Sequence, residues 1–155
     1  TGLFLGYYMP WDGYTNVLLS QAYGLRTYER NLEGSCVNYE NLDNYQVGIH
    51  DYFKYLKFGF GRASDLASMH VRRGRLSRED ACAIVRLQDG KFPWTYLGKP
   101  LAEVLKPLDI SVDEFIKICD KYTNKKLFLT DERGNLVKDR FGNLTKLKHA
   151  DEEKL

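Results

Sequence analysis

From Gly48 to Arg62 the chain reads GIHDYFKYLKFGFGR. Apolar side chains recur in this stretch at spacings of four, three and four residues, at Ile49, Phe53, Leu56 and Phe60. This spacing places them on one face of an α-helix that begins near Gly48. Gly59 and Gly61 interrupt the helix, because each glycine in a helix costs about 1 kcal/mol relative to Ala. The stretch therefore predicts a helix, then a kink or a close backbone approach at the glycines, and a new helix from Arg62.

Further helix signals lie on both sides of this stretch. Ser111 and Glu114 have the spacing of a capping box, in which each side chain bonds the other residue's backbone N–H. Ser77 is an N-cap followed by acidic residues that complement the helix dipole, and Pro100 suits the first turn of a short helix. Thr15 is a candidate N-cap for an earlier helix. Together these signals predict a mainly α-helical fold of about five helices.

The two ends of the chain depart from helical periodicity. Residues 3–8, LFLGYY, read as a short buried strand at the amino terminus. Residues 131–138, DERGNLVK, are echoed by DRFGNLTK at residues 139–146, and Gly-Asn turns between short apolar runs are typical of hairpins. We therefore expect a small carboxy-terminal β-meander over residues 126–148, followed by a frayed tail over residues 149–155.

The composition of the chain limits the classes of protein to which it can belong. The chain has 155 residues, of which 43% are hydrophobic, enough to fill one core. It holds no apolar run of the length that spans a membrane and no secretory signal. Cys36, Cys82 and Cys119 are odd in number and far apart, and only three His are present, so we expect no disulfide framework, no metal site and a cytoplasmic location. The chain opens without Met, as expected for a processed chain or for a piece of a longer one.

Positive charge is concentrated in one segment. The whole chain has a net charge of +2. Residues 54–75 contain one acidic side chain, Asp65, and six cationic ones. The cations are Lys54, Lys57, Arg62, Arg72, Arg73 and Arg75. Arg62, Asp65 and Arg72 share one stripe of the predicted helix. Guanidinium groups bind phosphates and carboxylates with two parallel hydrogen bonds, so the segment predicts an anion site, although such runs also form ordinary solvated helix faces.

Three further residues are weaker candidates for a site. His50 and Asp51 resemble an acid–base pair, but neighbouring side chains on a helix point about 100° apart, which disfavours direct contact. Asp12 follows a Pro-Trp pair and could bind a metal or a hydroxyl group, although an Asp before Gly usually forms a turn.

Residues 48–75 resemble the carboxy-terminal part of the N-acetyl sugar amidotransferases of bacterial lipopolysaccharide and O-antigen pathways. The matching strings are IHDY at residues 49–52, KFGFGRA at residues 57–63 and RRGR at residues 72–75. A looser match extends over residues 3–120. Its first part, LGYYMPWD at residues 5–12, looks like the family's exit from a nucleotide-binding domain.

The resemblance implies a domain organisation. Residues 1–12 would be the remnant of an upstream nucleotide-binding α/β domain. Residues 13–125 would form a helical domain, including a long polar loop over residues 26–46 of the kind that often carries function. The hairpin or meander expected over residues 126–148 rests on the Gly-Asn pattern, not on the resemblance.

The resemblance also implies a reaction. The family is similar to PP-loop ATP pyrophosphatases, in which ATP with Mg activates the sugar's acetamido oxygen and ammonia from a separate glutaminase partner displaces AMP. The family's Ser-Gly-Gly-x-Asp-Ser phosphate loop is not in this sequence, so we expect an enzymatic parent protein and an inactive isolated chain. The substrate would be a sugar nucleotide. Its phosphate or carboxylate would meet the basic residues Lys57, Arg62, Arg72, Arg73 and Arg75, with Asp65 orienting an arginine or a sugar hydroxyl.

Two other classes of function fit the same residues. A helical nucleic-acid-binding module is suggested by the arginines beside aromatic residues, but the charge is nearly balanced and no known binding signature is present. A structural or homo-oligomerisation domain would instead pair the arginines across an interface.

Overall fold

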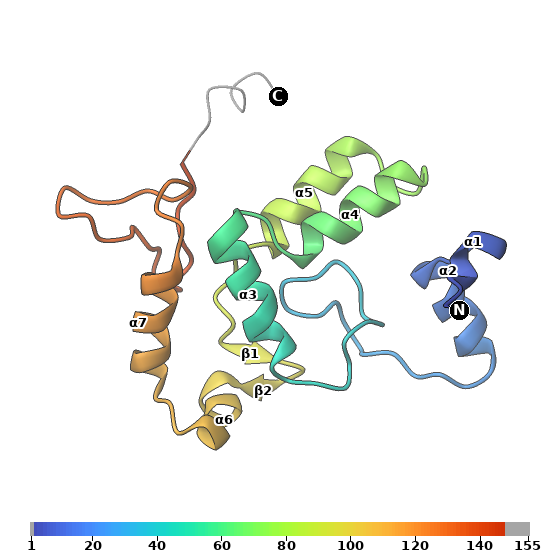
Figure 1. The fold of residues 1–155 in the computed structure, drawn as a ribbon, viewed down its shortest axis with the longest axis horizontal. Helices are drawn as coiled ribbons and strands as arrows, with labels where there is room; N and C mark the ends of the chain where they lie inside the picture. The colour runs from blue at the N-terminus through green and yellow to red at the C-terminus, as the bar shows by residue number, and fades with distance from the viewer. Residues whose placement is uncertain (1, 148–155) are drawn as a thin grey trace.

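The computed structural model describes residues 2–147 and is mainly helical (Figure 1). The helices are α1 Leu5–Tyr8, α2 Gly13–Ala22, α3 Val47–Phe58, α4 Arg62–Arg72, α5 Arg78–Gln88, α6 Leu101–Leu105 and α7 Val112–Tyr122. A two-stranded antiparallel sheet pairs β1 Thr95–Tyr96 with β2 Lys99–Pro100, and the short 3₁₀ helix η1 Lys106–Leu108 extends α6. None of the helices within the described residues is long and apolar enough to cross a membrane.

Helix α3 lies at the centre of the core. Its Leu56 is fully buried, and its Phe53 ring packs edge-on against Phe115 of α7 with the centroids 6.1 Å apart. Phe128, which follows α7, is also fully buried and packs on Tyr55. Burying a Leu or Phe side chain contributes about 1.5–3 kcal/mol, so these contacts hold α3, α7 and the following segment together.

The glycines after α3 act largely as the sequence predicts. Gly59 adopts a left-handed φ of 77° and ends α3, and α4 begins at Arg62. This turn takes Phe60 off the predicted apolar face, and its side chain is 44% exposed. A left-handed residue at the end of a helix redirects the chain, which periodicity alone does not show.

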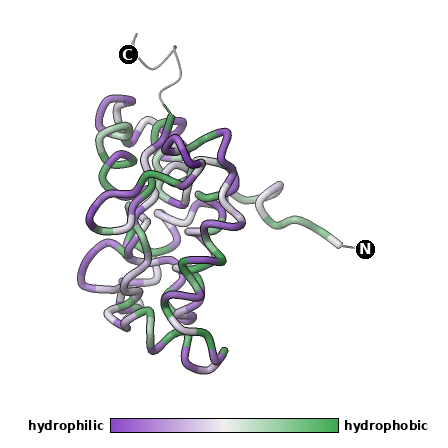
Figure 2. The backbone as a smooth tube through the Cα atoms, turned by 90° about the vertical axis from the view of Figure 1, so that its left-hand side faces the viewer, coloured by the Kyte–Doolittle hydropathy of each residue, from purple (hydrophilic) through white to green (hydrophobic). Residues whose placement is uncertain are grey.

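The predicted amino-terminal strand is wrong. Residues 5–8 form the one-turn helix α1, in which the Met9 N–H donates to the Leu5 carbonyl at 3.0 Å. A strand needs a neighbouring strand for its backbone groups, and within residues 2–147 none lies beside this segment. The cap of α2 also differs, because Asp12 is the N-cap and the Thr15 hydroxyl donates to it at 2.9 Å. We call residues 2–25 the apolar arm; its beginning projects from the body (Figure 2).

Residues 26–46 lack regular structure, as predicted, but they are not a loose loop. Leu32 and Val37 are buried, and the Ala63 N–H at the start of α4 donates to the Gly34 carbonyl at 3.1 Å.

The predicted meander is reduced to isolated antiparallel bridges, which join Phe128 to Lys146, residue 130 to 136, and residue 138 to 144. The Gly-Asn turns between them form as expected.

Candidate functional site

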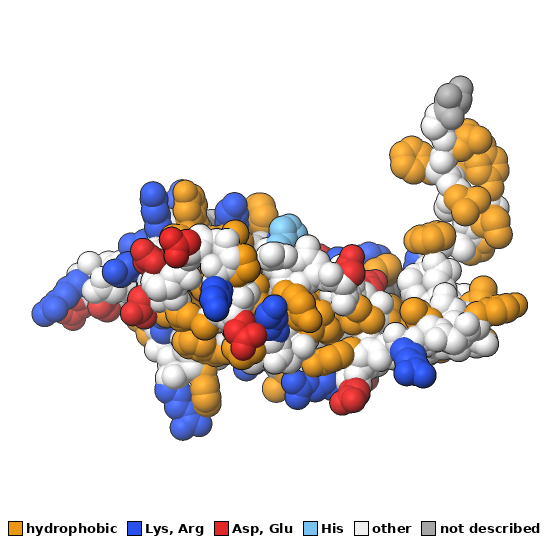
Figure 3. Space-filling model, turned by 90° about the horizontal axis from the view of Figure 1, so that it is seen from below, with side chains coloured by type: hydrophobic (Ala, Val, Ile, Leu, Met, Phe, Trp, Pro, Cys, Tyr) orange, Lys and Arg blue, Asp and Glu red, His pale blue; other side chains and the backbone are white. Residues whose placement is uncertain are grey.

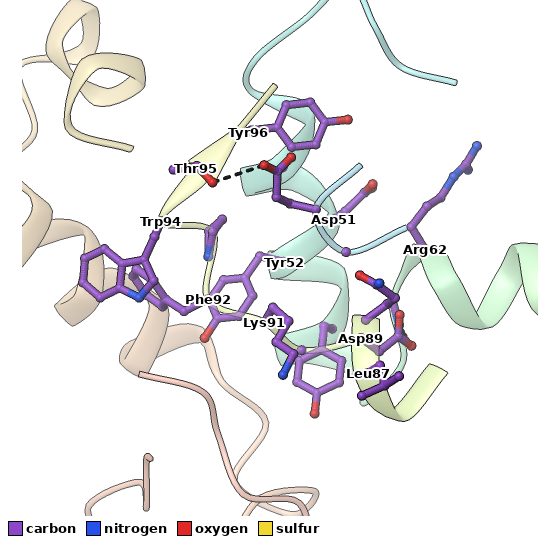
Figure 4. Close-up of a pocket in the computed structure, with 18 residues that line it drawn as sticks. Asp51, Tyr52, Arg62, Leu87, Asp89, Lys91, Phe92, Trp94, Thr95 and Tyr96 are labelled. Atoms are coloured by element: carbon purple, nitrogen blue, oxygen red, sulfur yellow. Dashed lines mark hydrogen bonds between the residues drawn. The ribbon is translucent and has the colours of Figure 1, made fainter. Parts of the chain in front are cut away.

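A cleft of about 240 Å³ lies between α3, the start of α4 and the segment that follows α5 (Figure 4). Its lining comes from Glu33 and Gly34, from α3, from residues 61–62, and from residues 87–96. The volume is below the range of about 300–1,000 Å³ that is typical of drug-sized ligand pockets. The cleft therefore suits one small ring or group.

Aromatic rings form much of the cleft wall. The Phe92 ring lies 4.5 Å from Trp94 and 5.4 Å from Tyr52, centroid to centroid. Burial raises the pKa of Tyr96 to about 12, and the carboxylates of Asp51 and Glu33 add to the shift, so its hydroxyl stays protonated at neutral pH.

Two glycines make room for these rings. A Cβ on Gly48 would lie 2.6 Å from the Tyr96 ring, and one on Gly90 would lie 2.3 Å from Tyr55. Gly90 also has a φ of +74°, which favours glycine. The two positions therefore require glycine for the cleft wall to pack as it does.

The charge of the cleft is not the positive one predicted from sequence. Three carboxylates, Glu33, Asp51 and Asp89, and two cations, Arg62 and Lys91, line it, which gives one net negative charge. The Arg62 guanidinium pairs with Glu40 and points away from the other labelled residues in Figure 4. A phosphate would be repelled by this balance, whereas a neutral ligand with hydroxyl groups would find acceptors.

The acidic groups of the cleft differ in how many hydrogen bonds they already accept. Asp89 accepts from the backbone N–H groups of Gly61 at 2.8 Å and Ala63 at 3.1 Å, and from the Ser64 hydroxyl at 2.6 Å, so it caps α4. A Cβ on Gly61 would lie 2.8 Å from Asp89, which explains the second glycine of the motif. Asp51 instead bonds to one group among the described residues, His50, and keeps capacity for a ligand.

Arg73 and Arg75 lie apart from the cleft, at the junction between the body and the apolar arm. Both pair with Asp12, and Arg73 also donates to the Trp11 carbonyl at 3.1 Å. The hydrogen bond from Arg75 holds the pKa of Asp12 well below its ordinary value. Arg75 and Tyr14 also line a second cavity of about 520 Å³. Asp12, a weak candidate for binding a metal or a hydroxyl group, is in the structure the carboxylate that pairs with Arg73 and Arg75.

The other predicted site residues do not gather at one point. Asp65 pairs with Lys54, while Lys57 and Arg72 are exposed. His50 Nδ1 lies 3.0 Å from Asp51 Oδ1, a direct contact that their neighbouring positions on the helix disfavour. Their side chains bend toward each other although the Cα–Cβ bonds diverge. The His50 side chain is 80% exposed, as in an ordinary surface pair.

Sequence reasoning missed most of the cleft. Glu33, Asp89, Trp94 and Tyr96 come from segments that it treated as loops or helix ends. The Asp89-Gly90 pair after a helix was the available signal, since an Asp before a Gly marks a turn. Among the described residues no cluster of three or more His, Cys, Asp or Glu could hold a metal ion.

Comparison with known families gives one match. Residues 33–145 match the model described as "LPS biosynthesis protein WbpG-like, C-terminal domain". The cleft lies within this range, whereas the apolar arm precedes it. A search of curated proteins found no match.

Proposed function

The chain belongs to the WbpG-like C-terminal domain family of lipopolysaccharide biosynthesis proteins, and from this premise we propose that it completes an ATP-dependent sugar amidotransferase. The proposed enzyme converts the N-acetyl group of a sugar nucleotide into an acetamidino group. This chain supplies part of the sugar site, and a nucleotide-binding domain upstream of it holds ATP and Mg.

The cleft is the observation that supports this proposal most directly. Aromatic rings pack against the apolar faces of sugars, and carboxylates accept hydrogen bonds from sugar hydroxyls. Tyr96 and Trp94 offer the rings, and Asp51 offers a carboxylate with free acceptor positions. Arg62 also lines the cleft, but its guanidinium is paired with Glu40, so we assign the direct sugar contact to Asp51.

The residues of this chain do not fit ATP itself. The cleft carries net negative charge, and Arg73 and Arg75 already pair with Asp12. ATP would transfer its AMP group to the acetamido oxygen with loss of pyrophosphate, and ammonia from a glutaminase partner would then displace the AMP. Arg73 and Arg75 could hold a substrate phosphate only by exchanging Asp12 for it. The exposed apolar side chains of the arm are suited to contact with the upstream domain.

The test is an assay of the full-length protein with ATP, ammonia and an N-acetyl sugar nucleotide. We expect release of AMP and a product in which an NH group replaces the acetamido oxygen, as read by mass spectrometry. Asp51→Asn should raise the KM for the sugar by about ten- to hundredfold, because a hydrogen bond to a charged group is lost. The KM for ATP should not change.

Glu103→Gln is the matched control, because Glu103 is exposed on α6 and outside the cleft. AMP release without a change in the acetamido group would contradict the amidotransferase assignment. An unchanged sugar KM in Asp51→Asn, with normal chemistry, would contradict the placement of the sugar in the cleft.

A further inference from the structure

A surface patch of Lys and Phe side chains lies at the carboxyl end of α3, outside both cavities. We call it the Lys–Phe patch, and it comprises Lys54, Lys57, Phe58, Phe60, Lys126 and Lys146. Phe58 is 61% exposed and Phe60 is 44% exposed, and their ring centroids are 6.2 Å apart. Contiguous exposed apolar surface rimmed by polar residues is typical of protein or membrane contact sites.

Segments that are far apart in sequence bring the lysines around these rings. The Lys54 ammonium lies 4.8 Å from the centroid of the Phe60 ring. The Asn124 side chain donates to the Lys57 carbonyl at 3.3 Å, which places exposed Lys126 close to the end of α3. A Cβ on Gly59 would lie 3.7 Å from Cε of Lys146. Lys57, Lys126 and Lys146 thus place positive charge beside the two phenylalanines, whereas Lys54 is paired with Asp65.

The charge around the patch extends beyond it. Residues 117–147 contain eight Lys or Arg and four Asp or Glu, a net charge of +4, compared with +2 for the whole chain. The apolar arm, residues 2–25, has a single charged residue, Asp12. Figure 3 shows the two kinds of surface at opposite ends of the molecule, with Lys and Arg at the left and apolar side chains at the right. Two different partners are therefore implied.

We propose that the Lys–Phe patch binds the surface of an anionic lipid bilayer. Lysine ammonium groups attract an anionic surface without a fixed geometry, whereas arginine forks are suited to discrete phosphates. Aromatic side chains beside lysines enter the boundary between headgroups and acyl chains. A single-stranded nucleic acid also favours cations with aromatic rings, but it normally follows a groove, and the patch lies outside both cavities.

This inference goes beyond the proposed amidotransferase, because binding to a bilayer is independent of the sugar chemistry. Binding to a bilayer would hold the domain at a membrane surface through the end of α3, while the apolar arm at the other end stays free for a protein contact. Experiments can therefore contradict the sugar chemistry without contradicting the bilayer binding, and the reverse.

The experiment measures co-sedimentation of the chain with vesicles. One set contains phosphatidylglycerol and phosphatidylcholine in equal parts, and the other contains phosphatidylcholine alone. We expect binding to the anionic vesicles that weakens as salt rises, and weaker binding to the neutral ones. Changing Lys57, Lys126 and Lys146 to Gln should weaken binding about fivefold per lysine. The double variant Phe58→Ser with Phe60→Ser should weaken binding to the anionic vesicles at every salt concentration.

Two controls separate the patch from the rest of the surface. Lys106→Gln removes an exposed lysine outside the patch and outside residues 117–147, and it should leave binding unchanged. Phe4→Ser with Tyr7→Ser removes exposed rings from the apolar arm and should leave binding to the anionic vesicles unchanged. Absence of binding, equal binding to both vesicle types, or tighter binding to a single-stranded oligonucleotide would each overturn the proposal.

Discussion

Two turns near the carboxyl end have the same local structure and different surroundings. In the first turn Asp131 Oδ1 accepts from the Asn135 backbone N–H at 2.8 Å, and in the second Asp139 Oδ1 accepts from the Asn143 N–H at 3.0 Å. The central glycines have φ values of 79° and 84°. Asp, Gly and Asn at these spacings determine this geometry, because every hydrogen bond involved joins residues at most four positions apart.

The tertiary contacts of the two turns differ. Asn143 Oδ1 accepts from the Phe92 N–H at 2.8 Å, and the Phe141 carbonyl accepts from Trp94 Nε1 at 2.7 Å. The second turn therefore supports the aromatic wall of the cleft. The first turn accepts one bond from Lys125, and a Cβ on Gly134 would meet no atom within 4 Å. Two turns with the same local structure therefore contribute differently to the stability of the fold.

The largest difference is expected between the leucines that follow the turns. Leu144 is 8% exposed and belongs to the core, whereas Leu136 packs at its edge. Leu144→Ala should lower the free energy of unfolding by about 2–4 kcal/mol and Leu136→Ala by about half as much, because less surface returns to water. Urea denaturation of the two variants measures this difference. Equal losses would mean that the second turn is not docked.

A smaller difference is expected between the asparagines. Asn135→Ala removes bonds within its own turn, whereas Asn143→Ala also leaves the Phe92 N–H without its acceptor. An unpaired buried donor costs about 1–3 kcal/mol, so Asn143→Ala should be the more destabilising by about that amount. Urea denaturation measures it, with Asn135→Ala as the matched control. If Asn135→Ala were equally damaging, the bond to Phe92 would contribute nothing.

The smallest effect concerns acid sensitivity, and here the two turns should behave alike. The Asn135 and Asn143 side-chain amides, with nearby backbone N–H groups, hold the pKa of Asp131 and of Asp139 below the ordinary value. A lowered folded-state pKa stabilises the fold fully above the unfolded pKa of about 3.9, and this contribution is lost as the pH falls through the folded-state pKa. Asp131→Asn and Asp139→Asn should each flatten the fall in the free energy of unfolding below about pH 4.

The measurement is urea denaturation at several pH values. The two variants should give similar curves, because the hydrogen bonds that lower each pKa come mainly from within the turn. A clearly larger effect of Asp139→Asn would show that its surroundings, including Lys91, dominate its titration.

The same division between local and distant contacts separates the predictions that hold from those that fail. The helix starts at Ser77 and Ser111 are confirmed, because each cap bonds a backbone N–H three residues later. The strand predicted for residues 3–8 is wrong, since a strand depends on a distant partner. The basic segment does not form one site, because the partners of Arg62 and Arg73 are Glu40 and Asp12, 22 and 61 residues away.

The sequence by itself determined the mainly helical class, the helix between Gly48 and Gly59, the Gly-Asn turns and, through resemblance, the family. These features depend on short-range hydrogen bonds and periodic burial, which a linear pattern records. Only the tertiary structure decided that the cleft is negatively charged, that Asp12 pairs with two arginines, and that one of two equal turns supports the cleft wall. These properties arise from pairs of residues that become neighbours only when the chain packs, so no local pattern contains them.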